Sequence, residues 1–294
     1  MGFFAIALWA TAVAAVRSLT AKVGPVTAGA VVYLLGGVLG VLLLIIQGCL
    51  SDSLRSLNRH YLFICGGLFV VYVGCLYAAL GLATSSSQAM EMGLINYLWP
   101  MLTVIFSIWI LKYRSNALLV PSIIFAAAGI FLATTQGQTF SWQGFVINMR
   151  SNPIIYLFGT LAAVSWGAYS VLSRKFAADV EGNVVPVFML ITGLILGVIR
   201  TFAAEKSSWT FTGMAEILYI AISTIASYSF WDMAMRHGNI ILVASVSYLL
   251  PLFSVLIAAL YLQAPLTPDL LVGAVFVILG AVLSNRSISN SSRL

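Results

Sequence analysis

Two stretches of similar chemistry decide how this chain folds: Asn96-Tyr97-Leu98-Trp99-Pro100 and, 151 residues later, Ser247-Tyr248-Leu249-Leu250-Pro251. Each lies near the middle of a long apolar segment. Proline removes a backbone N–H, and its ring clashes with the carbonyl four residues earlier, here that of Asn96 or Ser247. In lipid an unpaired carbonyl costs several kcal/mol, so a broken helix is tolerated only against protein or a water-filled cavity. The sequence therefore predicts two interrupted helices that face a shared interior.

The composition indicates an integral membrane protein. Of its 294 residues, 61% are hydrophobic and 7% are charged, whereas a typical soluble domain has about 25% charged residues. Apolar runs of roughly 18 to 24 residues are long enough to cross a hydrocarbon layer of about 30 Å as helices, and the alternating pattern of barrel strands is absent. The net charge of +6 comes from scattered single residues, which favours a role in membrane orientation over nucleic-acid binding.

We predict an all-α fold of ten transmembrane helices with short connections, so that neighbouring helices are antiparallel. The predicted spans are 2–16, 26–47, 61–83, 88–111, 118–135, 153–172, 184–203, 213–235, 239–262 and 270–284. Nine basic residues fall at one end of these spans: Arg55, Arg59, Lys112, Arg114, Arg174, Lys175, Arg236, Arg286 and Arg293. Five fall at the other: Arg17, Lys22, Arg150, Arg200 and Lys206. The positive-inside rule places the end with nine, and with it both termini, in the cytoplasm.

The two halves of the chain repeat one another. An offset of 157 relates Trp9 and Arg17 to Trp166 and Arg174, and Gly36 and Gly40 to Gly193 and Gly197. From the third span on, an offset of 151 relates Tyr77, Tyr97, Pro100 and Gly129 to Tyr228, Tyr248, Pro251 and Gly280. Five spans per repeat is an odd number, so residues 1–145 and 146–294 are predicted to insert with opposite topology. This is the inverted-repeat plan of secondary transporters, which places the binding site near the membrane midplane.

Small and polar residues form a stripe along each broken span. The stripe is Gly93, Asn96, Pro100, Thr103 and Ser107 in one span, and Ala244, Ser247, Pro251, Ser254 and Ala258 in the other. Such a stripe serves either close helix packing or the wall of a polar cavity. We predict that Pro100 and Pro251 act in gating, and that the glycine pairs Gly36/Gly40 and Gly193/Gly197 serve helix packing.

Aromatic residues with polar atoms lie inside the predicted spans, where they need partners or a cavity. The candidates for substrate binding are the aromatic residues Tyr72, Tyr97, Trp99, Trp166, Tyr169 and Tyr248, with Asn96 and Ser247 for the polar groups of the substrate. The alternative is that part of this set is core or faces lipid. Asn96 and Pro100, on the stripe, are the residues that we most expect to line a cavity, and Trp99 is the aromatic member that we expect least to do so.

Three acidic residues, Glu91, Glu216 and Asp232, lie within spans. An intramembrane acid is a functional candidate, and Glu91 is the candidate for proton coupling. The alternative, which we favour from the sequence, is that all three reach the membrane interface, because each lies near a predicted span end. The first span carries no acid, which disfavours the mechanism of small multidrug exporters that exchange protons for cationic drugs.

The sequence gives no support to an enzyme, a metal site or a cofactor. The three cysteines, Cys49, Cys65 and Cys75, and the two histidines, His60 and His237, have no metal-ligand spacing. No nucleophile–base pair or phosphate-binding glycine loop is present, and the loops are too short to build a soluble catalytic site.

The whole chain resembles the EamA-type transporters of the drug/metabolite transporter superfamily and, within it, the YddG-type aromatic amino acid exporters. The residues that carry this resemblance are 88–100, which end in Asn-Tyr-Leu-Trp-Pro, together with 68–72, 237–239, 247–251 and 264–266. The resemblance implies ten helices in two inverted repeats and export of aromatic amino acids. The chain departs from the family in lacking a short basic segment before the first helix.

We therefore expect a secondary transporter of the bacterial inner membrane that exports aromatic amino acids by alternating access. One alternative is the same fold with a non-aromatic metabolite or drug as substrate. A membrane scaffold without transport is a second alternative, which two helices broken at the midplane disfavour. The expected partners are the substrate and the lipid bilayer. The sequence does not set the oligomeric state, and a monomer is compatible with it.

Overall fold

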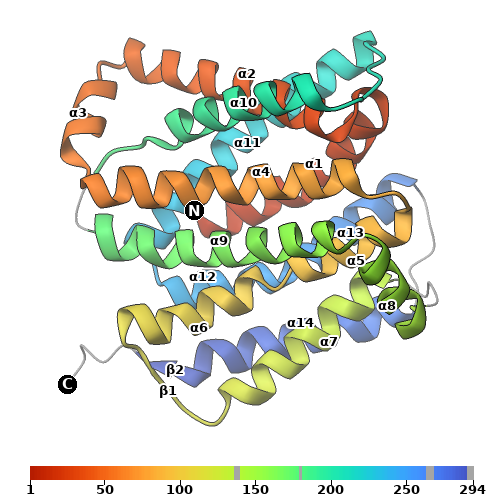
Figure 1. The fold of residues 1–294 in the computed structure, drawn as a ribbon. Helices are drawn as coiled ribbons and strands as arrows, with labels where there is room; N and C mark the ends of the chain where they lie inside the picture. Colours follow the sequence, from red (N-terminus) through yellow and green to blue (C-terminus); the bar gives the residue numbers. More distant parts are fainter. Residues whose placement is uncertain (136–139, 179–180, 263–267, 290–294) are drawn as a thin grey trace.

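The computed structural model describes residues 1–135, 140–178, 181–262 and 268–289. In this part of the chain nine helical segments are long and apolar enough to cross a membrane, and the shorter apolar helix α7 (Leu119–Thr135) provides one more span. The helices lie side by side in one bundle (Figure 1). The predicted all-α fold with ten transmembrane helices is confirmed.

The helices follow one another along the chain with few other elements. The first half contains α1 (Gly2–Val23), α2 (Pro25–Ile46), α3 (Leu50–Ser56), the π-helical turn η1 (Tyr61–Cys65), α4 (Gly66–Leu82), α5 (Ser86–Asn96), α6 (Trp99–Leu111) and α7. The second half contains α8 (Trp142–Ser151), α9 (Pro153–Ala177), α10 (Val185–Phe202), α11 (Phe211–His237), α12 (Ile240–Val246), the 3₁₀ turn η2 (Ser247–Leu249), α13 (Leu250–Leu262) and α14 (Pro268–Ser287). The short strands β1 (Arg114–Ser115) and β2 (Ile288–Ser289) pair antiparallel.

Both spans that carry the proline stretches are interrupted where the sequence predicts. One breaks at Tyr97 and Leu98, between α5 and α6, and Pro100 lies in the first turn of α6. The other breaks at η2, and α13 follows with Pro251 as its second residue. Proline is tolerated in the first turn of a helix because the N–H there has no helical partner. Each proline thus begins a new helix within the span.

Helices from the two halves pack against one another in matched pairs. Figure 1 shows α2 beside α10 at one edge of the bundle and α7 beside α14 at the other, and both pairs are in extensive contact. Between these edges α4 packs on α9, and α1 packs on α11. At the α7–α14 crossing, a Cβ atom at Gly129 would lie 2.6 Å from the backbone nitrogen of Val277, and one at Gly280 would lie 2.7 Å from that of Ala126. Only glycine permits this approach of the two backbones.

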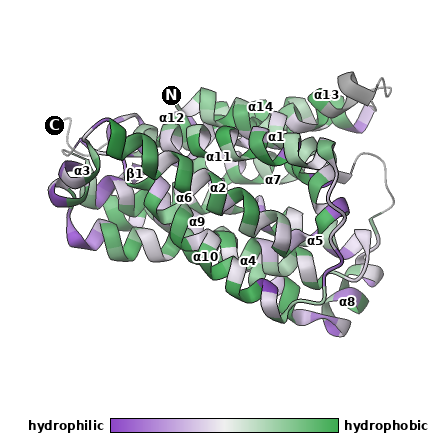
Figure 2. Ribbon diagram, turned by 90° about the horizontal axis from the view of Figure 1, so that it is seen from above, coloured by the Kyte–Doolittle hydropathy of each residue, from purple (hydrophilic) through white to green (hydrophobic). Residues whose placement is uncertain are grey.

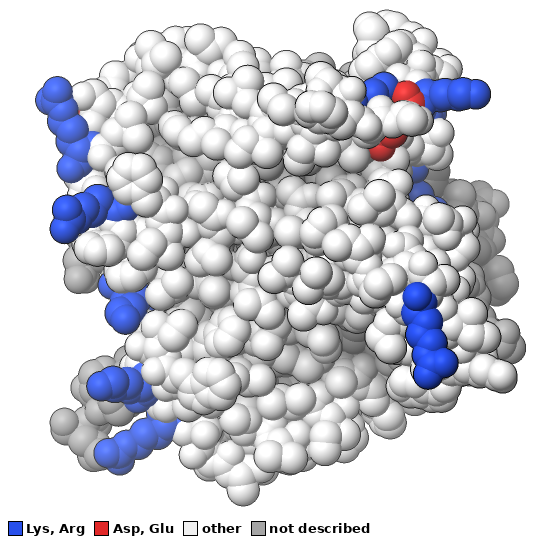
Figure 3. Space-filling view, viewed as in Figure 1, with Lys and Arg blue, Asp and Glu red and all other residues white. Residues whose placement is uncertain are grey.

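The surface has the distribution of a membrane protein. Figure 2 shows hydrophobic residues along most of the helices, with hydrophilic residues concentrated at the ends of the bundle near α3, β1 and α8. Figure 3 shows the same pattern in Lys and Arg, which gather at the two ends and leave the middle of this face uncharged. Large apolar side chains such as Phe63, Val120 and Val198 are exposed on the outside. An outer surface of this kind is suited to lipid.

The structure differs from the predicted spans most clearly at α1, α3 and α8, and α9 also continues five residues beyond its predicted end at 172. The first helix continues to Val23 instead of ending at 16, because its last turns are partly buried and Lys22 forms an ion pair. Two short helices, α3 and α8, lie in segments predicted as loops. The Ser141 side chain accepts a hydrogen bond from the Gly144 backbone N–H at the start of α8, and serine in this position is an N-cap signal for a helix.

Candidate functional site

A central cavity of about 810 Å³ lies among the helices that surround the broken span α5–α6. It runs from buried Trp99 and Trp166 in the middle of the molecule to exposed Arg17 and Ser86, which lie at the end of the bundle that carries α8. The cavity is lined by Trp9, Ala12, Val13, Val16, Arg17, Thr20, Pro25, Tyr33, Tyr72, Leu76, Tyr77, Leu80, Ser86, Ala89, Met90, Met92, Gly93, Asn96, Tyr97, Trp99, Thr134, Trp166, Ile220, Thr224, Tyr228 and Leu250. Both halves of the chain contribute to this lining.

The inner end of the cavity is a cluster of tryptophans. Trp9, Trp99 and Trp166 line the cavity, and buried Trp231 lies against all three. The ring centroid of Trp231 is 5.1 Å from that of Trp99 and 5.3 Å from that of Trp9. Edge-to-face and offset pairs at such distances stabilise one another. The cluster closes the cavity with a rigid aromatic floor.

Tyrosines form the walls next to this floor. The Tyr72 ring lies 4.6 Å from that of Trp166, and Tyr33 and Tyr228 share a hydrogen bond of 2.7 Å between their hydroxyl groups. Tyr77 packs edge-on against Tyr33. Such walls offer flat apolar faces with a few hydroxyl groups. They suit a ligand with an aromatic ring, and their faces attract an ammonium group.

The cavity holds few charged or amide groups. Among the described residues that line it, Arg17 at the mouth is the one charged side chain. Asn96 is the one lining amide, and its side-chain oxygen is buried without a well-formed hydrogen bond to the described part of the chain. A buried oxygen in this state is available to a ligand that donates a hydrogen bond.

The structure brings together five of the eight predicted substrate-binding residues. Tyr72, Asn96, Tyr97, Trp99 and Trp166 all line the cavity. The expectation that Trp99 would be the first to be lost from this lining was wrong. It assumed a continuous rotation of about 100° per residue, but the chain leaves the helix after Asn96 and starts a new one at Trp99.

The other predicted residues lie outside this cavity. Tyr169 lies beneath the floor, with its ring stacked on that of Trp166 at 4.9 Å. Tyr248 is fully buried among Met101, Ala126 and Val277. The Ser247 hydroxyl group donates at 2.6 Å to the Ala244 carbonyl, three residues earlier in α12. Pro100 and Pro251 are also buried, and neither belongs to the cavity lining, so the expectation that Pro100 lines the cavity was wrong.

Half of the small-residue stripe serves packing. Thr103 and Ser107 are fully buried and donate to carbonyls of their own helix, at 2.8 Å to Trp99 and 2.6 Å to Val104. In the second span, Ser254 likewise donates to the Leu250 carbonyl at 2.9 Å. Hydroxyl groups bonded in this way are already satisfied. The cavity side of the stripe consists of Gly93 and Asn96.

The glycine pairs differ in what they contact. A Cβ at Gly36 would lie 2.6 Å from the Met189 side chain, one at Gly40 would lie 2.7 Å from Pro186, and one at Gly193 would meet the backbone of Leu34. These three glycines lie at the crossing of α2 and α10. A Cβ at Gly197 would meet nothing within 4 Å, so this position does not require glycine for packing.

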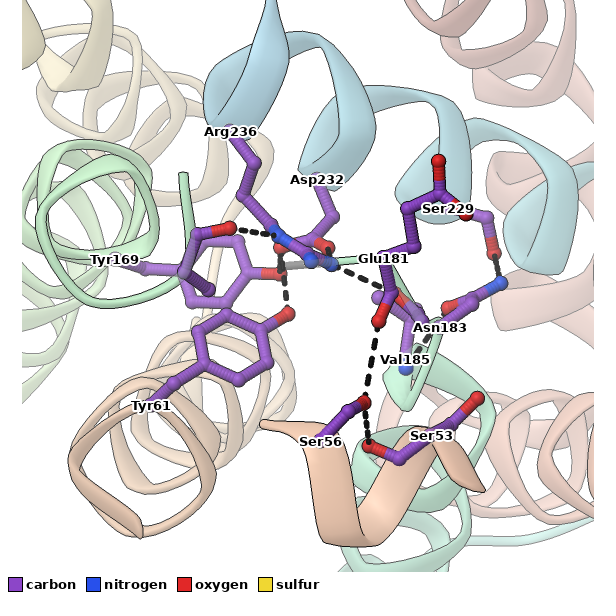
Figure 4. A network of polar contacts seen from close by, with 12 residues as sticks. Ser53, Ser56, Tyr61, Tyr169, Glu181, Asn183, Val185, Ser229, Asp232 and Arg236 are labelled. Atoms are coloured by element: carbon purple, nitrogen blue, oxygen red, sulfur yellow. Dashed lines mark hydrogen bonds and ion pairs between the residues drawn. The ribbon is translucent and has the colours of Figure 1, made fainter. Parts of the chain in front are cut away.

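A polar network lies at the opposite end of the floor (Figure 4). The Tyr61 and Tyr169 hydroxyl groups donate to the same Asp232 oxygen, at 2.7 and 2.8 Å. Arg236 forms an ion pair of 3.1 Å with the other oxygen and donates to the Gly182 carbonyl at 2.7 Å. The network joins η1, α9 and α11 where the central cavity does not reach.

The other two acidic residues predicted within spans, Glu91 and Glu216, lie at the end that carries the cavity mouth, and both have hydrogen-bond partners. Glu91 is 4% exposed and accepts hydrogen bonds from the Tyr156 hydroxyl group and, at 3.0 Å, from the Asn148 amide. Glu216 forms an ion pair of 2.7 Å with Lys22. The interpretation that the acids reach the membrane interface was therefore wrong for Glu91 and for Asp232, which is 2% exposed. Both are held inside the bundle by neighbouring hydroxyl or charged groups.

Sequence reasoning did not select several lining residues. Tyr33, Arg17 and Thr134 face the cavity from α2, α1 and α7. Tyr33 carries the same signal as the chosen tyrosines, a phenol inside an apolar span. Arg17 was assigned to membrane orientation and to the repeat but not to a binding site, because the predicted first span ended before it.

Comparison with known proteins identifies the family. The model of the EamA-like transporter family matches residues 1–135 and 153–286, two stretches of nearly equal length. The chain belongs to the EamA-like transporter family. It is therefore a membrane transporter and not an enzyme.

Three curated relatives of this EamA-family chain are named aromatic amino acid exporter YddG. Those of Salmonella typhimurium and Escherichia coli are 33% and 32% identical to it over 96% of this chain and 94% of their own length. That of Ancylobacter novellus is 31% identical over 97% of this chain and 95% of its own. A solved crystal structure has a TM-score of 0.78 and 29% identity, and the match covers 96% of this chain and 95% of the solved one. The likeness spans the whole fold, and the chain is a multi-pass membrane exporter.

Proposed function

We propose that this protein exports aromatic amino acids across the bacterial inner membrane by alternating access. The observation that carries this proposal is the cavity between the two halves of the chain, whose floor and walls are Trp9, Tyr72, Trp99, Trp166 and Tyr228. A flat aromatic side chain gains both apolar burial and ring contacts there. The names of the curated relatives point to the same substrate class.

The two halves, 1–145 and 146–294, act as inverted repeats in this proposal. At the offset of 151, Gly129 is equivalent to Gly280 and Ala126 is equivalent to Val277. The structure contains both of the equivalent contacts, Gly129 with Val277 and Gly280 with Ala126. The helix pairs follow the same exchange, since α4 packs on α9 and α1 packs on α11. Two related halves can rock about a shared central site, which then faces either end. The breaks at Tyr97–Leu98 and at η2, each with its proline, provide the hinges.

In this proposal the cavity faces the outside of the cell. Its mouth at Arg17 and Ser86 lies at the end with the smaller number of basic residues, so the positive-inside rule makes that end periplasmic. Both termini then lie in the cytoplasm, as ten spans require. The substrate enters from the closed end in a second conformation, and this structure corresponds to the state that releases it.

Glu91 is the candidate for proton coupling. It is buried on α5 beside α8 and α9, next to the lining residues Met90 and Met92, and its hydrogen-bond donors among the described residues are the neutral side chains of Asn148 and Tyr156. A buried carboxyl group without a basic partner is suited to carry a proton in one conformation. The Tyr156 hydroxyl group and the Asn148 amide would hold its charged form.

The test is flux of labelled phenylalanine in proteoliposomes, with and without an imposed pH gradient. We expect saturable flux that tryptophan and tyrosine inhibit and leucine does not. A flux that leucine inhibits equally well would favour a non-aromatic metabolite, and no substrate-dependent flux would reject a transporter of amino acids. If Glu91 carries the proton, Glu91→Gln removes the dependence on the gradient, whereas Glu216→Gln, at an ion pair outside the cavity, retains it.

A further inference from the structure

The ion pair of Asp232 and Arg236 lies between two cavities. Above it, Tyr169 stacks on Trp166 in the floor of the central cavity. Below it, a second cavity of about 850 Å³ opens at the cytoplasmic end of the proposed orientation and is lined by both members of the pair. In Figure 4 the carboxylate of Asp232 and the guanidinium group of Arg236 lie side by side, with the two tyrosine hydroxyl groups directed at the carboxylate. The pair thus occupies the partition between the two cavities.

An amino acid needs a charged site that the central cavity does not provide. Its head group carries one positive and one negative charge, whereas Arg17 at the mouth is the one charged side chain among the described lining residues. Asp232 and Arg236 offer one charge of each sign, at 2% and 1% exposure. Asp232 directly follows Trp231 in α11, and Arg236 lies one turn further along the same helix, so a head group bound to the pair leaves a substrate ring beside the tryptophan floor.

We infer that Asp232 and Arg236 bind the ammonium and carboxylate groups of the substrate when the transporter opens to the cytoplasm. This inference rests on the proposed export function. In the present state Tyr61 and Tyr169 occupy one Asp232 oxygen with two donated hydrogen bonds. Opening that end separates η1 and α9 from α11 and breaks those bonds. The ammonium group has three N–H donors and replaces both of them.

The repeat makes this site one-sided. The offsets place Gly81 at the position equivalent to Asp232, Ser85 at that of Arg236, Ala12 at that of Tyr169 and Thr212 at that of Tyr61. These residues are uncharged, and Ala12 is part of the present cavity wall. The head group is therefore bound by charge where the substrate is loaded and released where no such pair exists. This difference in affinity favours export when the cytoplasmic concentration is low.

The experiment measures binding from the cytoplasmic side with analogues that lack one charge. Uptake of labelled phenylalanine is measured in inside-out vesicles, and 3-phenylpropionate, which lacks the ammonium group, and phenethylamine, which lacks the carboxylate, serve as competitors. In the unaltered protein both analogues should bind about ten- to a hundredfold more weakly than phenylalanine, the effect of losing a hydrogen-bonded charge. Asp232→Asn should weaken the binding of phenylalanine by a similar factor and leave the binding of 3-phenylpropionate, which has no ammonium group, unchanged. Arg236→Gln should weaken the binding of 3-phenylpropionate and leave the binding of phenethylamine, which has no carboxylate, unchanged.

Tyr169→Phe gives a result of opposite sign. It removes a hydroxyl group that competes with the ammonium for Asp232, so phenylalanine should bind more tightly from the cytoplasmic side. A merely structural role for the network predicts weaker or unchanged binding instead. Glu216→Gln is the matched control, because it removes another acid of α11 that is ion-paired away from both cavities, and it should change none of these values.

The outcomes separate this inference from the export function. If the unaltered protein does not transport phenylalanine, the proposed function fails. If the unaltered protein transports phenylalanine, the double variant Asp232→Asn/Arg236→Gln decides the inference. If this variant inserts and still discriminates against both analogues, the pair only stabilises the fold and the inference is wrong. The double variant leaves neither charge buried alone, which guards against a simple failure to fold.

Discussion

At the scale of single residues, Trp166 is the side chain on which the aromatic site depends most. Its ring contacts Tyr72, Tyr169 and Trp231, and it is 1% exposed. We expect Trp166→Phe to retain phenylalanine transport, whereas Trp166→Leu should raise the half-saturating concentration about two- to tenfold, because a ring contact is worth about 0.5–1.5 kcal/mol beyond apolar burial. Competition assays in proteoliposomes measure this value.

The control for this residue is Trp109, which is 72% exposed on the outside of α6. Trp109→Leu should leave the half-saturating concentration unaltered. If Trp166→Leu behaves like Trp109→Leu, the ring at position 166 does not bind substrate. Thermal unfolding in detergent checks that loss of the Trp166 ring has not destabilised the bundle, since removing a buried aromatic ring costs about 3–5 kcal/mol in the extreme case of alanine.

Residue type could be predicted from the sequence, but the direction of each side chain could not. A tyrosine or tryptophan inside a span needs a polar partner, and this rule selected Tyr72, Tyr97 and Trp166 among the lining residues. The same rule selected Tyr248, which the structure buries away from the cavity. Helix phase is known only within one unbroken helix, so positions after Leu98 could not be oriented by counting from Asn96.

At the scale of elements, the two breaks are expected to set the rate of conformational exchange. Pro100→Ala restores the N–H that a continuous helix from α5 into α6 would use, and it removes the ring that clashes with the preceding turn. We expect a slower phenylalanine flux, with a free energy of unfolding that is unchanged or about 1 kcal/mol lower, because alanine leaves the unfolded chain more conformational freedom. Pro251→Ala should act in the same way at the equivalent break.

Pro153 provides the matched control, because it begins α9 and interrupts no span. Pro153→Ala should change neither the flux nor the binding of phenylalanine. Flux at the full rate in both Pro100→Ala and Pro251→Ala would contradict a hinge role. Stopped-flow flux measurements together with equilibrium binding distinguish a slower exchange from a damaged site.

Elements were predictable where one physical signal dominates. Long apolar runs fixed the spans, and proline fixed both breaks. The helices α3 and α8 were not predicted because each is too short to span a membrane, and α8 has no buried residue. The last turns of α1 escaped because Arg17 and Lys22 look like a span end, whereas in the fold Lys22 is neutralised by Glu216, 194 positions away in the chain.

At the scale of the whole molecule, the repeat predicts how the open mouth closes. Arg174 at the closed end donates to the carbonyl groups of Arg236 and Gly238, at the end of α11. The offsets carry these three residues to Arg17, Ser85 and Ser87. Arg17 and the intervening Ser86 both line the present mouth. We expect Arg17 to donate to the carbonyl groups of Ser85 and Ser87 in the cytoplasm-open state.

Two equivalent halves also explain what the sequence could not predict about the molecule. Matching residues at two offsets indicate a duplication and a central site, but they describe both alternating states equally well. Which end is open depends on a small free-energy difference between two packings of the same residues. Here the closed end has the Asp232–Arg236 pair and its two tyrosines, whereas their equivalents Gly81, Ser85, Ala12 and Thr212 offer no comparable contacts.

Removing one arginine should therefore shift this balance in a measurable direction. A cysteine in place of Val13, which lines the mouth, reports its opening to a membrane-impermeant thiol reagent in a protein without Cys49, Cys65 and Cys75. Arg174→Gln loses hydrogen bonds from a charged donor, worth roughly 1.5–3 kcal/mol, so labelling should slow about tenfold as the mouth closes. Arg17→Gln should leave labelling as fast or faster, and Arg150→Gln, an equal loss of charge on exposed α8, should have no effect. The two substitutions have opposite effects on the labelling rate only if the two ends of the molecule exchange roles. Slower labelling in Arg17→Gln, or an unchanged labelling rate in Arg174→Gln, would contradict the repeat-based mechanism.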